Sequence, residues 1–295
     1  MKKLLYLLLF SVLTQSINSQ IYSDKKLLLI RCDDIGMSHS VNLATKELID
    51  AGLKFSASVM VPCGWFDEAV SILKDADNVS IGIHLTLNSE WKNYRWGPVA
   101  GVSKVPSLVD SLGYFFPPRA KFFANNPSLD EVEIELRAQI EKAIKSGLKI
   151  AYLDYHMGTA VDKPEMRKIV EKLASEYKSA ISRYFGEDDV NSMYSIPIDS
   201  KYQHLISVLD SISTHKINLL VCHIGKDTEE MSALVDQNEF GLKEMSKHRN
   251  AELLALLKAV SAGEFEKRKI TLINYKDVKN HYSLSKMKSP SETGY

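Results

Sequence analysis

The sequence predicts an α/β fold in which parallel strands alternate with helices, as a sheet or a barrel. Short runs of branched apolar residues recur along the chain without polar alternation, which is typical of strands buried on both faces. Stretches with helical start and stop signals separate these runs. Repeats of this length imply parallel strands joined by right-handed crossovers.

Seven segments are predicted to be strands. The first begins at Leu27 and ends in two adjacent carboxylates, Asp33 and Asp34, before Gly36 lets the backbone turn. The other six are expected, in chain order, at residues 55–61, 79–83, 150–153, 180–182, 219–222 and 269–273.

Helix signals fill the gaps between these strands. Ser38 is predicted to cap a helix over residues 41–51. Ser128 and Glu131 have the spacing of a capping box before a long helix that ends near residue 146. Further helices are expected at residues 66–74, 165–177 and 246–262.

The two ends of the chain depart from this pattern. Lys2 and Lys3 precede an apolar run over residues 4–13 and then small and polar residues, the layout of a secretory signal peptide. The run is shorter than the roughly 20 apolar residues that span a bilayer. We therefore expect an exported protein, periplasmic or secreted, with a signal peptide at residues 1–20, a single domain at 21–285 and a disordered tail at 286–295.

Composition limits the classes of partner. The 295 residues include 37 basic and 37 acidic side chains, and this zero formal charge disfavours nucleic acid and anionic membranes, which both attract a basic excess. Three cysteines, Cys32, Cys63 and Cys222, are too few for a disulfide framework and are predicted to be buried thiols. The sequence leaves the oligomeric state open.

Asp33 and Asp34 are neighbouring acids at the end of a buried strand. Their repulsion raises the pKa of one of them unless a cation lies beside the pair, so they indicate a metal site or a proton-sharing dyad. The structural alternative is that both are turn and cap residues of the following helix.

Several other polar residues directly follow the apolar run of a predicted strand, namely His84, Asp154, His156, Arg183 and His223. In a parallel barrel, the carboxyl ends of the strands converge on one face, where active sites are built. A single histidine there is more often structural. One carboxylate and two imidazoles, from Asp34, His84 and His156, would nevertheless form a three-ligand metal site with open positions.

The motifs at these strand ends resemble those of the YdjC-like carbohydrate deacetylases, also called the ChbG family, within the polysaccharide deacetylase superfamily. The resemblance runs in order through LLIRCDDIG at 28–36, SASVMV at 56–61, IGIHLTL at 81–87, LDYHMGT at 153–159, ISR at 181–183, VCHIG at 221–225 and RNAEL at 249–253. It implies an irregular seven-stranded (β/α) barrel of the glycoside hydrolase/deacetylase type, acting on an acetylated sugar.

The resemblance also implies roles for single residues. Asp34, His84 and His156 would hold a divalent metal ion, zinc or magnesium, and Asp33 would be the base that activates a metal-bound water. His223 would protonate the departing amine. Two further residues would have supporting roles: an arginine, Arg183, orienting the catalytic carboxylate, and a carboxylate, Asp154, fixing the tautomer of a ligand imidazole.

Two positions depart from the family pattern. Gly158 stands where many members have the second histidine of Asp-X-His-X-His, and Ile224 replaces the proline of a His-Pro-Gly motif. The first change leaves the three-ligand set complete and therefore bears on substrate choice more than on metal binding. Ile224 in place of proline could change the direction of the loop after His223.

These observations favour a metal-dependent deacetylase of N-acetylated sugars or short oligosaccharides. A non-catalytic carbohydrate-binding protein on the same barrel is one alternative, and a metal-dependent hydrolase of another bond is a second. The irregular, aromatic-rich stretch 88–126 leaves a choice as well. Its Trp91, Tyr94 and Trp96 could stack on sugar rings or pack a lid onto the barrel mouth.

Overall fold

The computed structural model describes residues 24–239 and 241–290. The predicted signal peptide lies outside these ranges, as do residues 291–295 of the predicted disordered tail. The described part of that tail is packed on the barrel, because Met287 contacts the core and the backbone N–H of Lys288 donates to the carbonyl of Tyr184 at 2.9 Å. Within the described ranges, no helix combines the length and the apolar character needed to cross a membrane.

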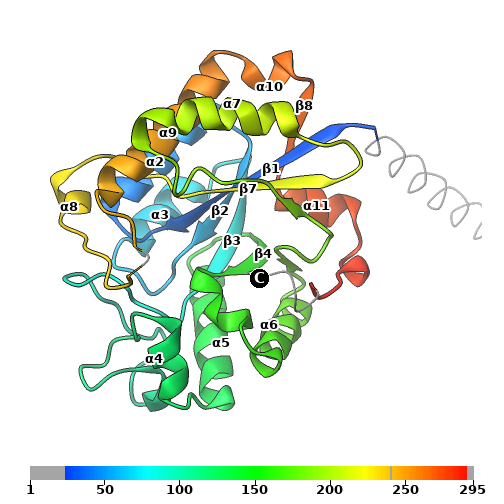
Figure 1. The fold of residues 1–295 in the computed structure, drawn as a ribbon. Coiled ribbons are helices and arrows are strands. Elements are labelled where there is room, and N and C mark those ends of the chain that lie inside the picture. The colour runs from blue at the N-terminus through cyan, green and yellow to red at the C-terminus, as the bar shows by residue number, and fades with distance from the viewer. Residues whose placement is uncertain (1–23, 240, 291–295) are drawn as a thin grey trace, which may run out of the picture.

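A single sheet of parallel strands forms the centre of the molecule (Figure 1). Its order is β5-β4-β3-β2-β1-β7-β6, and β8 pairs with β1. The strands are β1 (Lys26–Ile35), β2 (Phe55–Val59), β3 (Val79–Leu85), β4 (Ile150–Tyr155), β5 (Ala180–Ile181), β6 (Asp188–Asp189), β7 (Ile217–Cys222) and β8 (Ile270–Ile273). The described pairings leave the curled sheet open between β5 and β6, so the barrel is irregular, as predicted.

All seven predicted strands are present. The strand that the sequence did not predict is β6, which consists of two exposed acidic residues beside β7. It carries no apolar run, so hydrophobic periodicity could not indicate it. Its pairing with β7 depends on the position of a surface loop rather than on burial.

Helices cover the outside of the sheet, with α7 and α9 on one side and α5 and α6 on another (Figure 1). The α-helices are α2 (His39–Asp50), α3 (Phe66–Leu73), α4 (Arg119–Ala124), α5 (Leu129–Lys145), α6 (Pro164–Glu176), α7 (Lys201–Ser211), α8 (Glu229–Ser232), α9 (Met245–Ser261), α10 (Glu264–Lys267) and α11 (Tyr275–His281). Short 3-10 helices occur at Pro106–Leu108, His156–Val161, Ile198–Ser200 and Leu284–Lys286.

Of the two helix caps predicted from the sequence, the one at Ser38 is present and the one at Ser128 is not. Ser38 caps α2 as expected, its hydroxyl accepting a hydrogen bond from the Val41 N–H at 3.3 Å. The capping box of α5 is wrong, because the Ser128 side chain makes no cap bond. Glu131 instead accepts two bonds of 2.7 Å from the backbone N–H and hydroxyl of Ser107, which ties the irregular stretch 88–126 to α5.

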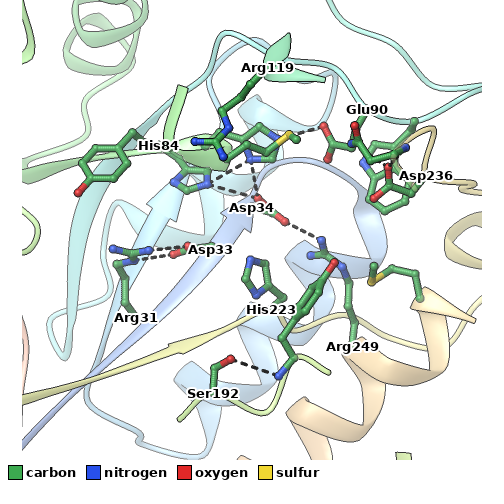
Figure 2. A pocket seen from close by; sticks show the side chains of 18 of the residues that line it. Arg31, Asp33, Asp34, His84, Glu90, Arg119, Ser192, His223, Asp236 and Arg249 are labelled. Atoms are coloured by element: carbon green, nitrogen blue, oxygen red, sulfur yellow. Dashed lines mark hydrogen bonds and ion pairs between the residues drawn. The ribbon is translucent and has the colours of Figure 1, made fainter. Parts of the chain in front are cut away.

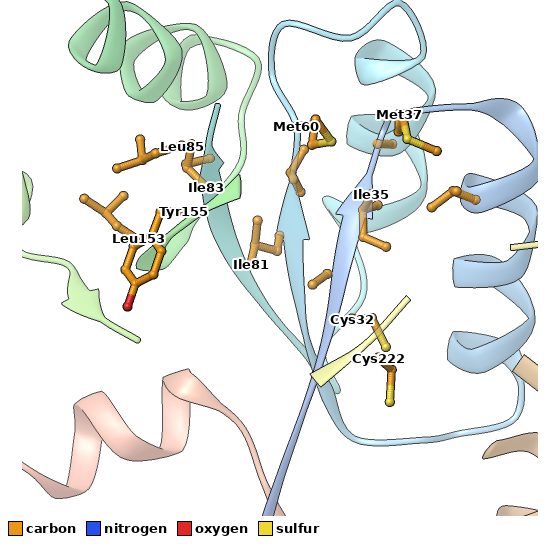
Figure 3. Close-up of a cluster of buried hydrophobic side chains, with 14 of the residues drawn as sticks. Cys32, Ile35, Met37, Met60, Ile81, Ile83, Leu85, Leu153, Tyr155 and Cys222 are labelled. Carbon is orange, nitrogen blue, oxygen red and sulfur yellow. The ribbon is translucent and has the colours of Figure 1, made fainter. Parts of the chain in front are cut away.

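Side chains of β1 alternate between two cores, as expected for a strand buried on both faces. Leu28, Ile30 and Cys32 belong to the large core under the helices. Figure 3 shows Cys32 beside Cys222 of β7, its register partner. All three cysteines are buried free thiols, as predicted.

The opposite face of β1 lines the interior of the curled sheet. Leu27 and Leu29 lie there in a smaller core that includes Tyr152 of β4. This interior is tight: a Cβ added to Gly82 of β3 would lie 2.3 Å from the Tyr152 ring. Continuing the same alternation places Arg31 and Asp33 on the interior face, so the interior changes from apolar to polar towards the carboxyl ends of the strands.

Candidate active site

A pocket of about 510 Å³ opens at the carboxyl ends of the strands (Figure 2). The six residues predicted to be catalytic or metal-binding all line it, namely Asp33, Asp34, His84, His156, Arg183 and His223. They come from β1, β3, the ends of β4, β5 and β7, which the sheet order brings together. The convergence of strand ends predicted from the sequence is therefore present.

A break in β1 turns both adjacent acids towards the pocket. Along a regular strand, Asp34 would point away from the face that carries Asp33. Its φ of 66° is left-handed, and the pairing with β2 shifts register between Cys32 and Ile35. Both carboxylates consequently line the same pocket, at the cost of backbone strain that is typical of functional sites.

Asp34, His84 and His156 form a compact group with one ligand atom each. Oδ1 of Asp34 lies 3.5 Å from Nε2 of His84 and 3.4 Å from Nδ1 of His156, and the two ring nitrogens lie 3.3 Å apart. All three side chains are buried, and Oδ1 of Asp34 has no hydrogen-bond partner among the described residues.

This group fits a metal ion. Ligand atoms bonded to a four-coordinate ion at about 2.0–2.1 Å lie about 3.4 Å from one another, which matches the three observed separations. A buried carboxylate oxygen that accepts no hydrogen bond is costly unless positive charge lies beside it; without metal the two imidazoles supply that charge when protonated, and a metal ion would replace their protons. Two imidazoles and one carboxylate are also ligands that zinc and related divalent ions accept.

Each imidazole of this group is held from behind by a carboxylate. Oε2 of Glu90 lies 3.0 Å from Nε2 of His156 as a hydrogen bond. Oδ2 of Asp154 lies 3.1 Å from Nδ1 of His84, within ion-pair distance but without hydrogen-bond alignment. Such partners fix the tautomer and the orientation of ligand histidines. The supporting position predicted for Asp154 is therefore occupied, and Glu90 has the equivalent position on the second histidine.

Asp33 is held by Arg31 from its own strand. Nε and Nη2 of Arg31 donate to the two oxygens of Asp33, each at 2.7 Å, and Nε also lies 3.1 Å from Asp154. Burial raises the pKa of Asp33, but the charges of Arg31 and His84 together with the hydrogen bonds from Arg31 outweigh this effect and lower that pKa to about 2. Asp33 is thus ionised and oriented, as a general base must be.

The resemblance implied this orienting role for Arg183, whereas in the structure Arg31 makes the contacts with Asp33. Both oxygens of Asp33 are taken by Arg31, whereas Arg183 donates from Nε and Nη2 to Asp189, at 2.7 Å each. Arg183 lines the pocket but follows the two-residue strand β5, beside β6. Arg31 reaches Asp33 because residues two apart on a strand share a face.

The charges of the buried ligands depend on their neighbours. Burial lowers the pKa of His84, but the carboxylates of Asp154 and Asp33 outweigh this and raise it to about 10. Burial also lowers the pKa of His156, but the charge of Glu90 together with the interactions with Asp34 outweighs burial and raises the pKa to about 9. Burial would raise the pKa of Asp34, but the charge of Arg249 holds it well below its ordinary value.

His223 lines the same pocket from the end of β7. Its backbone N–H donates to Oε2 of Glu252 at 2.8 Å, and its ring packs edge-on against Tyr194 with centroids 5.2 Å apart. Nδ1 has no hydrogen-bond partner among the described residues. Burial lowers the pKa of His223, so the ring is mostly neutral at pH 7.

Sequence reasoning missed three buried charges of the site, namely Arg31, Glu90 and Arg249. Arg31 interrupts an otherwise apolar strand, and that interruption was an available signal. Glu90 lies in the irregular stretch, and Arg249 lies on α9, where its Nη2 donates to Oδ2 of Asp34 at 2.6 Å. Neither of these two follows a strand, so the strand-end pattern could not indicate them.

The aromatic stretch mainly packs against the barrel. Trp91 and Trp96 are only 1% and 4% exposed, and the Trp96 indole donates to the carbonyl of Asn88. The Tyr94 hydroxyl donates to the carbonyl of Met37 at 2.6 Å. Trp91 lines the pocket from this stretch. Of the two readings, the structure favours a packed lid over an open stacking platform.

Comparison with known proteins identifies related sequences along most of the chain. A carbohydrate deacetylase of Brevibacillus brevis is 27% identical over 265 residues, which cover 85% of this chain and 99% of that protein. A carbohydrate deacetylase of Enterococcus faecalis is 28% identical over 269 residues, covering 87% and 99%. One from Thermus thermophilus is 36% identical over 154 residues, covering 52% of each chain.

Solved structures share the fold. A protein of Enterococcus faecalis described as a cellobiose-phosphate cleavage protein superposes with a TM-score of 0.70 at 23% identity, covering 86% of this chain and 99% of that chain. A peptidoglycan N-acetylglucosamine deacetylase gives 0.52 at 11% identity, covering 90% and 92%. The sequence model of the YdjC-like proteins matches residues 27–263, and the chain belongs to this family.

Proposed function

We propose that this protein is a metal-dependent deacetylase that hydrolyses the acetyl amide of N-acetylated sugars or short oligosaccharides. The observation that carries the proposal is the unpaired Oδ1 of Asp34 facing His84 and His156, next to an Asp33 that Arg31 holds ionised. The relatives named carbohydrate deacetylase support removal of an acetyl group from a carbohydrate.

Amide hydrolysis needs an activated water, an electrophilic carbonyl and a proton for the leaving nitrogen. A divalent metal ion held by Asp34, His84 and His156 would polarise the carbonyl and lower the pKa of water. Asp33 would accept the proton of the attacking water, since its pKa of about 2 keeps it ionised. His223, which is mostly neutral in the free protein, would take up a proton from solvent after the substrate binds and would donate it to the departing amine as the carbon–nitrogen bond breaks.

The spacing of the ligand atoms supports zinc over magnesium. Octahedral magnesium with bonds of about 2.1 Å brings neighbouring ligand atoms to about 3.0 Å from one another. The separations of 3.3, 3.4 and 3.5 Å agree better with a four-coordinate ion. Nitrogen ligands also suit zinc better than magnesium.

Acetate release tests the proposal directly. The metal-free protein is loaded with zinc or magnesium and incubated with N-acetylated mono- and disaccharides, and acetate and free amine are measured. We expect equimolar release of both with zinc. Asp33→Asn should lower the rate by about 10²- to 10⁴-fold while zinc stays bound at one ion per chain.

The exposed Asp75→Asn is the matched control, because it removes the same charge far from the pocket lining. No acetate from any of these sugars with either metal, in a folded and metal-loaded protein, would contradict the proposal. Sugar binding that persists in metal-free protein and in His84→Ala would favour the non-catalytic alternative.

We also propose that the protein is exported to the periplasm or secreted. The support is the charged and then apolar pattern of residues 1–20. Cell fractionation with N-terminal sequencing checks this proposal. A cytoplasmic protein that retains residue 1 would contradict it.

A further inference from the structure

Arg249 carries a buried charge that the hydrolytic scheme above does not use fully. Its side chain is 4% exposed, and one of its nitrogens, Nη2, donates to Oδ2 of Asp34 at 2.6 Å. Nε and Nη1 have no hydrogen-bond partner among the described residues. Leaving donors of a buried guanidinium unpaired is costly, which points to a ligand that pairs with them.

Arg249 belongs to a wall of the pocket that also carries Asp34, His223 and Tyr194. Figure 2 shows the guanidinium beside Asp34 and near His223, whose Nδ1 is also without a partner. Oδ2 of Asp34 is already taken by Arg249 itself. This wall therefore complements a group rich in acceptor oxygens, and its cation favours one that bears negative charge.

The motif after β7 makes room for this arginine. A Cβ added to Gly225 would lie 3.2 Å from Cβ and 3.5 Å from Cδ of Arg249. The absence of a side chain at Gly225 thus lets α9 bring the stem of Arg249 close to the end of β7. Glu252, one turn further along α9, accepts a hydrogen bond from the backbone N–H of His223 at 2.8 Å. Helix α9 therefore contacts the end of β1 through Arg249 and the end of β7 through Glu252.

We propose that Arg249 binds the acyl oxygen of the substrate and the carboxylate of the acetate product, through its unpaired Nε and Nη1 groups. This inference rests on the proposed deacetylase function and adds a binding residue to it. Negative charge develops on the acyl oxygen as water adds to the carbonyl. A fixed guanidinium, shielded from water beside that oxygen, stabilises this charge without reorganisation.

Access to the two donors needs a small rearrangement. Both atoms are shielded from solvent here, and Met245 lines the same pocket four residues earlier on α9. Residues four apart share a helix face, and methionine has three rotatable bonds.

The test separates binding of acetate from positioning of Asp34. Zinc affinity of the wild type, Arg249→Gln and Arg249→Lys is measured by chelator competition. Acetate binding is then measured at full zinc occupancy from the broadening of the acetate methyl resonance, and kcat/KM is measured by amine release. Lys247→Gln, which removes an exposed cation from the same helix, is the control.

We expect Arg249→Gln to lose on the order of 10²-fold in kcat/KM at full zinc occupancy and to bind acetate at least tenfold more weakly. Arg249→Lys should lose less, since it keeps the charge. Gly225→Ala, which retains Arg249 but crowds its stem, should change both quantities in the same direction and serves as the second variant if Arg249→Gln fails to fold.

Acetate binding by Arg249→Gln that equals the wild type at full zinc occupancy would overturn the inference, and so would a rate that recovers completely when more zinc is added. Either result would limit Arg249 to positioning Asp34. A wild type that releases no acetate from N-acetylated sugars would instead contradict the proposed function, which keeps the two failures distinguishable.

Discussion

The two adjacent acids at the end of β1, Asp33 and Asp34, differ in how many of their carboxylate oxygens are hydrogen-bonded. We call the surroundings of each acid the Asp33 side and the Asp34 side of the pocket. On the Asp33 side, both carboxylate oxygens are bound by Arg31. On the Asp34 side, Oδ1 of Asp34 and Nδ1 of His223 have no partner in the described chain, although all these groups are buried or partly buried. Asp33 itself is fully paired by Arg31, although Oδ1 of the neighbouring Asp154 has no partner in the described chain. Asp34, in contrast, keeps one oxygen without a hydrogen bond from any described residue, facing the two imidazoles.

This difference explains why an ion fits one acid and not its neighbour. Asp33, His84 and Asp154 also lie close enough together to hold a cation. Arg31 already supplies positive charge there, at 2.7 Å from Asp33 and 3.1 Å from Asp154. Arg249 pairs with only one oxygen of Asp34, whereas Arg31 binds both oxygens of Asp33, which disfavours an ion at Asp33 and fixes the geometry of a base.

Removing a ligand from the Asp34 side should have the largest effect. We expect His156→Ala to lower zinc affinity by well over the roughly 100-fold that an outer partner contributes, and to abolish acetate release. The exposed His215→Ala controls for the loss of an imidazole. If His156→Ala bound zinc within tenfold of the wild-type affinity, His156 would not be a metal ligand, and the difference between Asp34 and Asp33 would lose its explanation.

Removing Arg31 should lower the stability of the protein and raise the pKa of Asp33, while zinc stays bound to Asp34, His84 and His156. Arg31→Gln leaves Asp33 buried without its counter-charge, so we expect a loss of about 3–5 kcal/mol in the free energy of unfolding. Because burial raises the pKa of Asp33 once Arg31 no longer lowers it, the acid limb of the kcat/KM profile should move to higher pH.

A surface arginine provides the contrast. Arg137 forms exposed pairs with Glu133 and Glu176, so Arg137→Gln should cost less than about 1 kcal/mol and leave the profile unchanged. An Arg31→Gln variant with wild-type stability and an unmoved acid limb would show that Arg31 does not hold Asp33. Chemical denaturation and pH profiles measure both quantities.

Zinc binding should release protons, since the Asp34 side holds protonated imidazoles in the absence of metal. The pKa of His84 is about 10 and that of His156 about 9, so both rings are protonated at pH 7 and must be neutral to bind zinc. Calorimetry in buffers of different ionisation enthalpy should give release approaching two protons per ion at pH 7. Apparent affinity should rise with pH up to about 10, and release near zero at pH 7 would contradict these charges.

Removing the outer carboxylates should have the smallest effect. We expect Glu90→Gln and Asp154→Asn each to weaken zinc binding by about 10- to 100-fold, because each leaves the ligand nitrogen in place but loosens its orientation. Asp154→Asn should also lower kcat, because Asp154 contacts Arg31 on the Asp33 side. If Glu90→Gln and Asp154→Asn lowered kcat equally, the result would contradict a specific role of Asp154 next to Arg31 and Asp33.

The sequence predicted the fold and the strand-end residues for one physical reason. Strands buried on both faces are apolar, so the first polar residue after each run marks its end, and parallel strand ends meet. This logic indicated Asp33, Asp34, His84 and His156. It failed where contact depends on tertiary packing, as for Glu90 in an irregular stretch and Arg249 on a helix. For the orienting arginine, the resemblance pointed to the end of β5, whereas strand alternation brings Arg31 next to Asp33.

Local rules failed in a similar way at α5. Ser128 and Glu131 have the spacing of a capping box, yet Glu131 binds Ser107 from a segment distant in sequence. The strained backbone of Asp34, which turns the second acid into the pocket, also leaves no signal in the residue pattern. Both depend on where other elements of the fold lie.

Anomalous diffraction from crystals of zinc-loaded protein, recorded at the zinc edge, tests the central claim most directly. We predict one strong peak bounded by Asp34, His84 and His156, with Arg31 still bound to both oxygens of Asp33. A peak between Asp33 and Asp154 with Arg31 displaced, or no peak at this pocket in protein that holds zinc, would contradict the account.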